Sequence, residues 1–272
     1  IPVRLQFARP VRTAQGEFTA RDSVLLELRD SDGVAGYGEA APWPGFGTET
    51  AEQAGALLTA AVVSLTDLEL EPGQWTPALV ALLHQAPAAR AAVQGALWDL
   101  AARRAGQPLA EHLAARVGPL RGAGLQRVAV SALLVAREPD ALRDEAARAV
   151  AAGHRAVKLK VGAAPLAVDV ARVRAVREGL GRGVRLRIDA NGAWSAAQAH
   201  AALEALAGFE LDYVEQPLAA DDIVGLAALR RDAPVRIALD ESVASEQGAL
   251  HLLALGAADV VVLKPATLGG PA

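Results

Sequence analysis

Lysine is confined to three positions in this chain, and each position could hold a reactive amine. Lys158, Lys160 and Lys264 are the only lysines among 27 basic residues, so every other basic residue is an arginine. Arginine stays protonated inside a protein, whereas a buried lysine can change its pKa and act as a base. The three lysines lie in or end apolar, β-branched runs that are typical of strands. The pattern predicts that these amines take part in chemistry.

Three carboxylates fall between the lysines at regular spacing. Asp189, Glu215 and Asp240 close three successive apolar runs, and the positions from Lys160 to Lys264 follow one another at intervals of 24 to 29 residues. In a (β/α) barrel the carboxyl ends of the strands meet at one mouth, so we expect these side chains to converge. Three unpartnered carboxylates would repel one another. Mg²⁺ prefers oxygen ligands and would relieve that repulsion, and Mn²⁺ could substitute for it.

This combination predicts proton abstraction beside a carboxylate. A substrate carboxylate on such a metal would have a more acidic α-proton, because the metal stabilises the enediolate that forms. A neighbouring lysine could remove that proton near neutral pH. Side-chain alternation puts Lys158 and Lys160 on one face of their strand and points Arg187 inward beside Asp189. Three further polar residues are supporting candidates, with a structural role as the alternative for each: Arg187, Asn191 and Glu241.

The elements before residue 120 predict an α+β domain. Alternating segments at Val3–Phe7 and Ser23–Leu28 predict a small antiparallel sheet. The turn Asp30–Gly33 joins the second segment to Val34–Glu39. Helical periodicity follows at about 50–65, 77–85 and 88–104. We expect a capping domain over residues 1–120.

A different rhythm over residues 121–272 predicts part of a modified (β/α) TIM-type barrel that carries the catalytic residues. Strand-like runs alternate there with Ala/Leu/Arg-rich helical stretches. No Gly-rich dinucleotide fingerprint follows any of these runs. Six runs are visible where a barrel has eight strands, so we expect the native barrel to continue beyond this chain. The runs are 127–134, 156–161, 184–189, 211–215, 235–239 and 259–264.

A Pro/Gly-stiffened segment from Gly38 to Gly47 presents two aromatic residues, Trp43 and Phe46. One interpretation is an aromatic turn that packs on its own domain. The other is a lid that covers the barrel mouth, excludes water and contacts an apolar substrate.

Composition excludes several classes of function. The net charge of −4 does not resemble a nucleic-acid-binding surface, and no apolar run reaches membrane-spanning length. The absence of cysteine excludes disulfides and thiolate chemistry, and the five histidines have no zinc-ligand spacing. We therefore expect a cytoplasmic protein that binds a small-molecule carboxylate and neither nucleic acid nor membrane. Homo-oligomerisation is left open.

Five motifs together make the chain resemble the enolase superfamily, in its muconate-lactonizing-enzyme-like subgroup. The resemblance implies a capping domain and a modified barrel, with Asp189, Glu215 and Asp240 as Mg²⁺ ligands. It also implies that Lys160 and Lys264 lie on opposite faces of the substrate. The motifs are Lys158-Leu159-Lys160, Asp189-Ala190-Asn191, Val214-Glu215-Gln216-Pro217, Leu239-Asp240-Glu241-Ser242 and Leu263-Lys264-Pro265.

Within that subgroup the segment from Gly38 to Phe46, Arg187 and the Lys264-Pro265 pair resemble the o-succinylbenzoate synthase family of menaquinone biosynthesis. The resemblance implies that this lyase removes water from 2-succinyl-6-hydroxy-2,4-cyclohexadiene-1-carboxylate. Lys160 would take the α-proton and return a proton to the departing hydroxyl, while Lys264 would stabilise the enediolate. Two alternatives stay open. One is an N-acylamino-acid racemase or dipeptide epimerase with the same residues, and the other is a catalytically silent barrel that only binds ligands.

Overall fold

A computed structural model describes residues 1–13, 16–66, 72–117 and 128–270. The chain forms two compact units, one of residues 1–125 with 264–272 and the other of residues 126–263. The domain boundary predicted near residue 120 lies outside the described residues. Within the described ranges, no helix combines the length and the apolar character needed to cross a membrane.

The first unit contains the predicted antiparallel sheet. Its strands are β1 (Pro2–Thr13), β2 (Gly16–Arg29) and β3 (Ala35–Ala40), in the order β1-β2-β3. The turn after β2 closes as predicted, because the Gly33 amide donates to the Asp30 carbonyl at 3.1 Å and Gly33 has a φ of 84°. A positive φ favours glycine, which explains the residue at this position.

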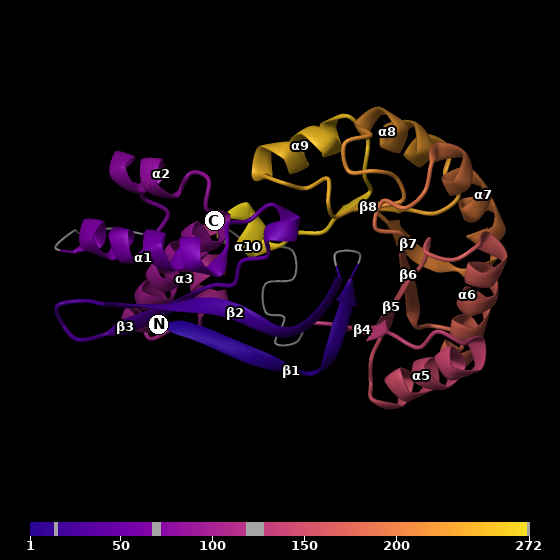
Figure 1. Cartoon of the computed structure of the whole chain (residues 1–272), viewed down its shortest axis with the longest axis horizontal. Helices are drawn as coiled ribbons and strands as arrows, with labels where there is room; N and C mark the ends of the chain where they lie inside the picture. Colours follow the sequence, from indigo (N-terminus) through magenta and orange to yellow (C-terminus); the bar gives the residue numbers. More distant parts are fainter. Residues whose placement is uncertain (14–15, 67–71, 118–127, 271–272) are drawn as a thin grey trace. The chain divides into compact units, whose positions relative to one another are not determined.

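Helix α3 (Pro87–Arg104) packs directly on this sheet (Figure 1). The close approach requires glycine in β3, since a Cβ on Gly38 would lie 1.9 Å from the Ala92 carbonyl oxygen. Glu49 is buried and accepts hydrogen bonds from the amides of Ala88 and Ala89, which satisfies free donors in the first turn of α3. The other helices of this unit are η1 (Pro44–Phe46), α1 (Ala51–Leu65), α2 (Pro77–Leu83), α4 (Leu109–Val117) and α10 (Pro265–Leu268).

The second unit is a sheet of parallel strands in sequence order, each joined to the next by a helix. Figure 1 shows these helices along one side of the strands. Consecutive parallel order with the helices on one side is the arrangement of a (β/α) barrel. The strands are β4 (Ser131–Leu134), β5 (Ala156–Lys160), β6 (Arg185–Asp189), β7 (Leu211–Glu215), β8 (Ile237–Leu239) and β9 (Val260–Val261). The helices are α5 (Pro139–Ala151), α6 (Leu166–Leu180), α7 (Ala196–Leu206), α8 (Ile223–Asp232) and α9 (Glu246–Ala254), with a short η2 (Ala207–Phe209) before β7.

The fold class predicted from the sequence is confirmed, with two local differences. Helix α4 was not predicted. The last strand is shorter than the run 259–264, because β9 ends at Val261 and Lys264 is instead the N-cap residue of α10. Pro265 follows Lys264 and begins that helix, since proline suits the first helical turn and cannot donate a ladder hydrogen bond.

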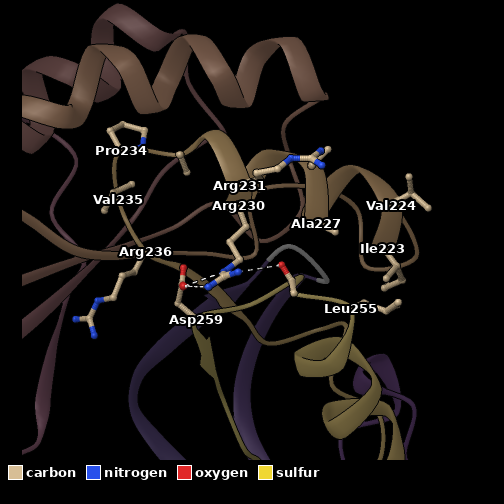
Figure 2. A pocket seen from close by; sticks show the side chains of 13 residues that line it. Ile223, Val224, Ala227, Arg230, Arg231, Pro234, Val235, Arg236, Leu255 and Asp259 are labelled. Atoms are coloured by element: carbon tan, nitrogen blue, oxygen red, sulfur yellow. Dashed lines mark hydrogen bonds and ion pairs between the residues drawn. The ribbon is translucent and has the colours of Figure 1, made fainter.

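A surface hollow lies beside the amino-terminal ends of β8 and β9 (Figure 2). Arginines line it, but Figure 2 shows that Arg231 and Arg236 point away from each other. Arg230 forms an ion pair with Asp259 at 2.6 Å, and Arg236 is paired with Asp212. Active sites of (β/α) barrels form at the opposite, carboxyl ends of the strands, so this hollow is not where the predicted site residues gather.

Candidate active site

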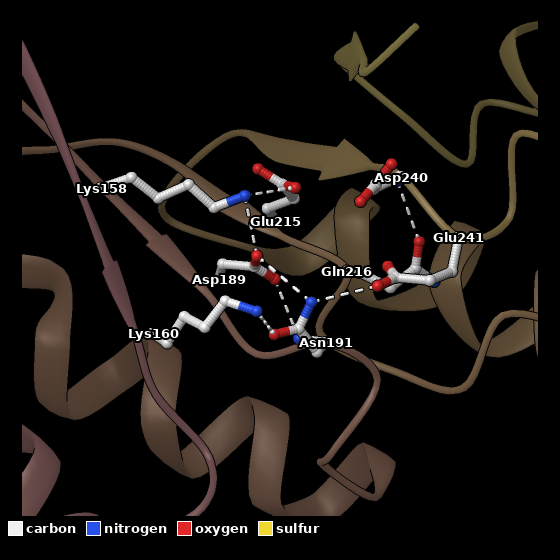
Figure 3. A network of polar contacts seen from close by, with 8 residues as sticks. All are labelled: Lys158, Lys160, Asp189, Asn191, Glu215, Gln216, Asp240 and Glu241. Carbon is white, nitrogen blue, oxygen red and sulfur yellow. Dashed lines mark hydrogen bonds and ion pairs between the residues drawn. The ribbon is translucent and has the colours of Figure 1, made fainter. Parts of the chain in front are cut away.

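Strand β5 presents two lysines on the face away from the helices. Val157 and Leu159 are fully buried, while Lys158 and Lys160 alternate with them and are partly exposed. The Lys158 Nζ lies 2.7 Å from Asp189 Oδ2 and 2.7 Å from Glu215 Oε1 (Figure 3). Sequence alternation therefore predicted the shared face correctly, and the structure adds that Lys158 bridges two strand-end carboxylates.

The two bridged carboxylates are brought together by strand register. Lys160 pairs with Asp189 across β5 and β6, and Asp189 pairs with Glu215 across β6 and β7. Asp240 directly follows β8. The three carboxylic residues are buried, with exposures of 1% for Asp189, 1% for Glu215 and 7% for Asp240. Three acidic side chains thus lie at the carboxyl ends of adjacent strands, as the spacing predicted.

Burial and charge shift two pKa values at this end of the sheet. Burial and the charge of Asp189 raise the pKa of Glu215 above its usual range, Asp240 adds to this, and Lys158 only partly offsets it. Burial alone would lower the pKa of Lys158, but the charges of Asp189 and Glu215 and the hydrogen bonds to both raise it overall. The two carboxylates therefore favour the ammonium form of Lys158, which suits a supporting cation.

The donor chemistry fits a hard divalent cation, although the carboxylates are not arranged around one. Among the described residues, no group of three or more His, Asp or Glu side chains is placed to hold a metal ion. Lys158 occupies the space between Asp189 and Glu215 instead. The carboxylate oxygens are nevertheless the kind of donor that Mg²⁺ binds. The ligand set Asp189, Glu215 and Asp240 stays a prediction.

Asn191 links the second lysine of β5 to the acidic residues. Its Oδ1 accepts a hydrogen bond from Lys160 Nζ at 2.9 Å. Its Nδ2 donates to Asp189 Oδ2 at 3.2 Å and to Glu241 Oε1 at 3.0 Å (Figure 3). Asn191 has a φ of 46°, a left-handed conformation that asparagine adopts more easily than most residues. The structure thus brings Lys160, Asn191 and Glu241 into one network.

Arg187 alternates with the buried Leu186 and Ile188, so it lies on the strand face that alternation predicted. Its Nε donates to Asp212 Oδ2 at 2.9 Å, and its guanidinium carbon lies 4.9 Å from the centre of the Tyr213 ring. The register of β6 against β7 shifts between Leu186 and Arg187, and this shift makes room for Asp212. The structure thus keeps Arg187 on the predicted face and adds its ion pair with Asp212.

The remaining predicted residues belong to the first unit. Lys264 is grouped with residues 1–125, and there its Nζ lies 4.2 Å from the centre of the Phe46 ring. Trp43 packs at steep interplanar angles against Phe18, at 4.8 Å between ring centres, and against Phe46, at 6.1 Å. The aromatic segment thus packs on its own unit, which was the first of its two interpretations, and it also contacts a predicted catalytic lysine.

Sequence reasoning missed three residues that hold the strand ends in place. Gln216 is fully buried with a φ of 39°, and its side chain accepts from the Asp240 amide at 3.0 Å. Asp169 is buried on α6, where it accepts from the Gly162 amide at 2.7 Å and from Arg172 at 2.7 Å. Arg172 also donates to the Lys160 carbonyl at 3.1 Å. The Asp-Arg spacing of three residues on a helix was the available signal.

Comparison with known proteins agrees with the fold. The family model "Mandelate racemase / muconate lactonizing enzyme, N-terminal domain" matches residues 1–114, and "Enolase C-terminal domain-like" matches residues 141–272. A hydrophobic dipeptide epimerase of Enterococcus faecalis is 33% identical over 94% of this chain and 70% of its own length. An o-succinylbenzoate synthase of Geobacillus kaustophilus is 33% identical over 98% of this chain and 69% of its own length.

The same relationship holds in three dimensions. The dipeptide epimerase from Enterococcus faecalis V583, in a crystal structure with Mg and the dipeptide L-Leu-L-Tyr, matches with a TM-score of 0.87 at 30% identity. The match covers 99% of this chain and 74% of that one. The two family models together span both units, and the parallel strands with acidic ends follow the same order as the predicted motifs. This chain therefore belongs to the enolase superfamily of enzymes, in the subgroup that contains the muconate-lactonizing enzymes.

Proposed function

We propose that this chain carries the active site of a Mg²⁺-dependent enzyme that removes the α-proton of a small carboxylate. One observation carries the proposal: the Lys160 Nζ lies at the carboxyl end of its strand, joined through Asn191 to the carboxylates of Asp189 and Glu241. Removal of an α-proton requires a general base, which the lysine can supply, beside acidic residues that can hold a metal. The division into a capping domain over 1–120 and a barrel over 121–272 is part of the proposal.

The three lysines have different surroundings, and we assign a different role to each. Lys160 is the base, because its nearest partner is the neutral amide of Asn191 and its amine can accept a proton from the substrate. Lys158 is held by Asp189 and Glu215 and supplies a fixed positive charge. Lys264 serves the other face of the substrate, as the family resemblance implies. Arg187 is occupied by Asp212 and contributes to the shape of the strand face.

Asp189, Glu215 and Asp240 would hold the Mg²⁺. When bound, the ion would stabilise negative charge on the substrate carboxylate as the α-proton leaves. The three residues are suited to this because they are buried carboxylates at the ends of adjacent strands. The pair Trp43 and Phe46 would exclude water from an apolar substrate.

For the overall reaction we propose dehydration to o-succinylbenzoate. Lys160 takes the proton from the α-carbon, and the electrons of that C–H bond pass into the enediolate. The ring hydroxyl then leaves with its C–O bonding electrons and receives the same proton from Lys160. Water departs, the ring becomes aromatic, and the Lys160 amine is restored. The o-succinylbenzoate synthase relative at 33% identity supports this choice.

Epimerisation is the second candidate, and the structural similarity to a dipeptide epimerase at a TM-score of 0.87 favours it. In that reaction Lys160 would remove the proton from one face and Lys264 would deliver one to the other. N-acylamino acids and dipeptides both have the required α-proton next to a carbonyl group. The first step is the same in both candidates, so only the substrate and the proton return distinguish them.

The test assays the full chain with Mg²⁺ on the cyclohexadiene carboxylate, on N-succinyl amino acids and on hydrophobic dipeptides, side by side. We expect α-proton exchange into deuterium oxide with at least one class, and loss of that exchange on chelation with EDTA. Lys160→Ala lowers the rate about 1,000-fold, within the range of general base catalysis. Arg174→Ala, an exposed arginine on α6, is the control and retains the rate. Normal turnover by Lys160→Ala would remove the assigned base.

A further inference from the structure

The segment of residues 41–48, here called the capping loop, is built as a rigid unit. The Trp43 amide donates to Thr48 Oγ1 at 2.6 Å, and the Phe46 amide donates to the Trp43 carbonyl at 2.8 Å. Gly47 ends the single turn with a φ of 82°. Arg21 of β2 stacks on Trp43 at 4.6 Å, and Phe18 packs against the same ring. The Phe46 ring is therefore held in place from its own unit.

The backbone of Lys264 is also fixed within this unit. Its carbonyl accepts from Thr267 Oγ1 at 2.9 Å and from the Leu268 amide at 3.1 Å, which anchors it to the first turn of α10. At the other end of α10, Arg90 from α3 donates to the carbonyls of Leu268 at 2.5 Å and Gly269 at 3.3 Å. Arg90 thus joins α10 to α3, so the start of the Lys264 side chain has a fixed position relative to the capping loop.

Between these two anchored groups, the Lys264 Nζ lies 4.2 Å from the centre of the Phe46 ring. An ammonium within about 6 Å of an aromatic face is attracted by the electrons of the ring. Both residues are only partly exposed, which strengthens such an attraction relative to one in open water. The Phe46 ring is therefore a direct contact of the Lys264 amine.

We propose that Phe46 is a positioning residue for Lys264. Its ring holds the ammonium in a defined place through a cation–π contact, and Arg90 anchors the far end of α10, the helix that follows Lys264. The position of the capping loop therefore determines the position of the Lys264 amine. The catalytic consequence rests on the proposed function, whereas the contact itself can be tested without any substrate.

Lysine is so rare here that the contact can be observed directly. Protein of residues 1–272 grown with lysine labelled with ¹³C at Cε gives three labelled methylene signals, and Lys264→Arg identifies one of them. We expect that signal at high field in the wild type, because it lies over the Phe46 ring. Phe46→Leu moves it toward the free-lysine position, Phe46→Tyr leaves it shifted, and Phe7→Leu, a matched change in β1, moves none of the three. An unshifted Lys264 signal in the wild type, or one that Phe46→Leu does not move, overturns the proposal.

A double-mutant cycle tests whether the contact acts through the lysine. Phe46→Leu lowers kcat about threefold to thirtyfold, the range of a single cation–π contact, and Phe46→Tyr restores it. In a Lys264→Met background the same substitution has no further effect, because non-additive losses mark residues that act together. A full additional loss in that background overturns the positioning role. If the Lys264 signal is shifted but the protein has no proton-exchange activity, the contact with Phe46 is supported and the proposed function is wrong.

Discussion

The two compact units place their functional side chains by different physical means. In the unit of residues 126–263, Lys160, Asp189 and Glu215 are neighbours because parallel strands in register align their carboxyl ends. In the other unit, Phe46 and Lys264 meet because separate elements pack on one sheet and one helix. Strand register is written into a repeating sequence pattern, whereas packing between distant segments is not. Periodicity therefore specifies the placement of side chains in the one unit, and tertiary packing specifies it in the other.

The largest loss of stability is expected at the buried ion pair of Asp169 and Arg172, which contacts the backbone of Lys160 in the second unit. Asp169→Asn leaves Arg172 without its buried partner, and breaking such a pair costs about 3 kcal/mol of unfolding free energy. Proton abstraction should fall as well, since Arg172 also holds the Lys160 carbonyl. The measurements are urea unfolding and the deuterium-exchange rate.

The matched control for this ion pair is Asp140→Asn. Asp140 and Arg143 form an ion pair with the same three-residue spacing on α5, but the Asp140 side chain is 90% exposed. An exposed pair contributes about 0.5 kcal/mol, so the control should hardly change stability or activity. Equal losses of unfolding free energy in the two variants would show that burial is not what makes the Asp169–Arg172 ion pair important.

The next effect tests the packing in the first unit. Gly38→Ala places a methyl group against the Ala92 carbonyl and should destabilise the unit by about 2 kcal/mol, because overpacking forces the backbone to move. Gly55→Ala on α1 is the control, since the nearest atom to its new Cβ is 3.8 Å away and alanine favours a helix. Thermal unfolding of both variants is the measurement. A Gly38→Ala protein as stable as the wild type would mean that α3 can shift on the sheet.

The smallest effect is expected at the amino-terminal ends of the strands in the second unit. Burial alone would raise the pKa of Asp259, but the hydrogen bonds from Arg230 and from the Ile237 amide lower it below its usual range. A depressed folded pKa stabilises the protein above the unfolded pKa, about 3.9, and this stability is lost as the pH falls through the folded value. Asp259→Asn should therefore cost about 1 kcal/mol at pH 7.

Urea unfolding of wild type and Asp259→Asn between pH 7 and pH 3.5 measures this effect. The difference in unfolding free energy should stay constant near neutral pH and begin to shrink near pH 4. A difference that does not change with pH would assign the loss to hydrogen-bond geometry and not to charge. Proton-exchange activity at pH 7 should be preserved, because Asp259 lies at the strand ends opposite the candidate site.

Much of the second unit could be predicted from the sequence because its signals are local. Apolar runs at regular intervals marked β5, β6 and β7, and alternation within β5 put Lys158 and Lys160 on one face. Alternation also put Arg187 on the face of Asp189, but it did not reveal the partner of Arg187, which is Asp212 at a register shift. A register shift depends on how two strands pair, and one strand's pattern does not contain that information.

The sequence by itself therefore determined the order of the elements, the shared face of two lysines and the acidic strand ends, because these follow from periodicities of a few residues. Only the tertiary structure decided that Lys158 bridges Asp189 and Glu215, that Asp169 and Arg172 support β5, and that Lys264 lies over Phe46. These contacts join residues from separate elements. Their distances depend on how side chains fill the space between those elements, which no repeating pattern in the chain encodes.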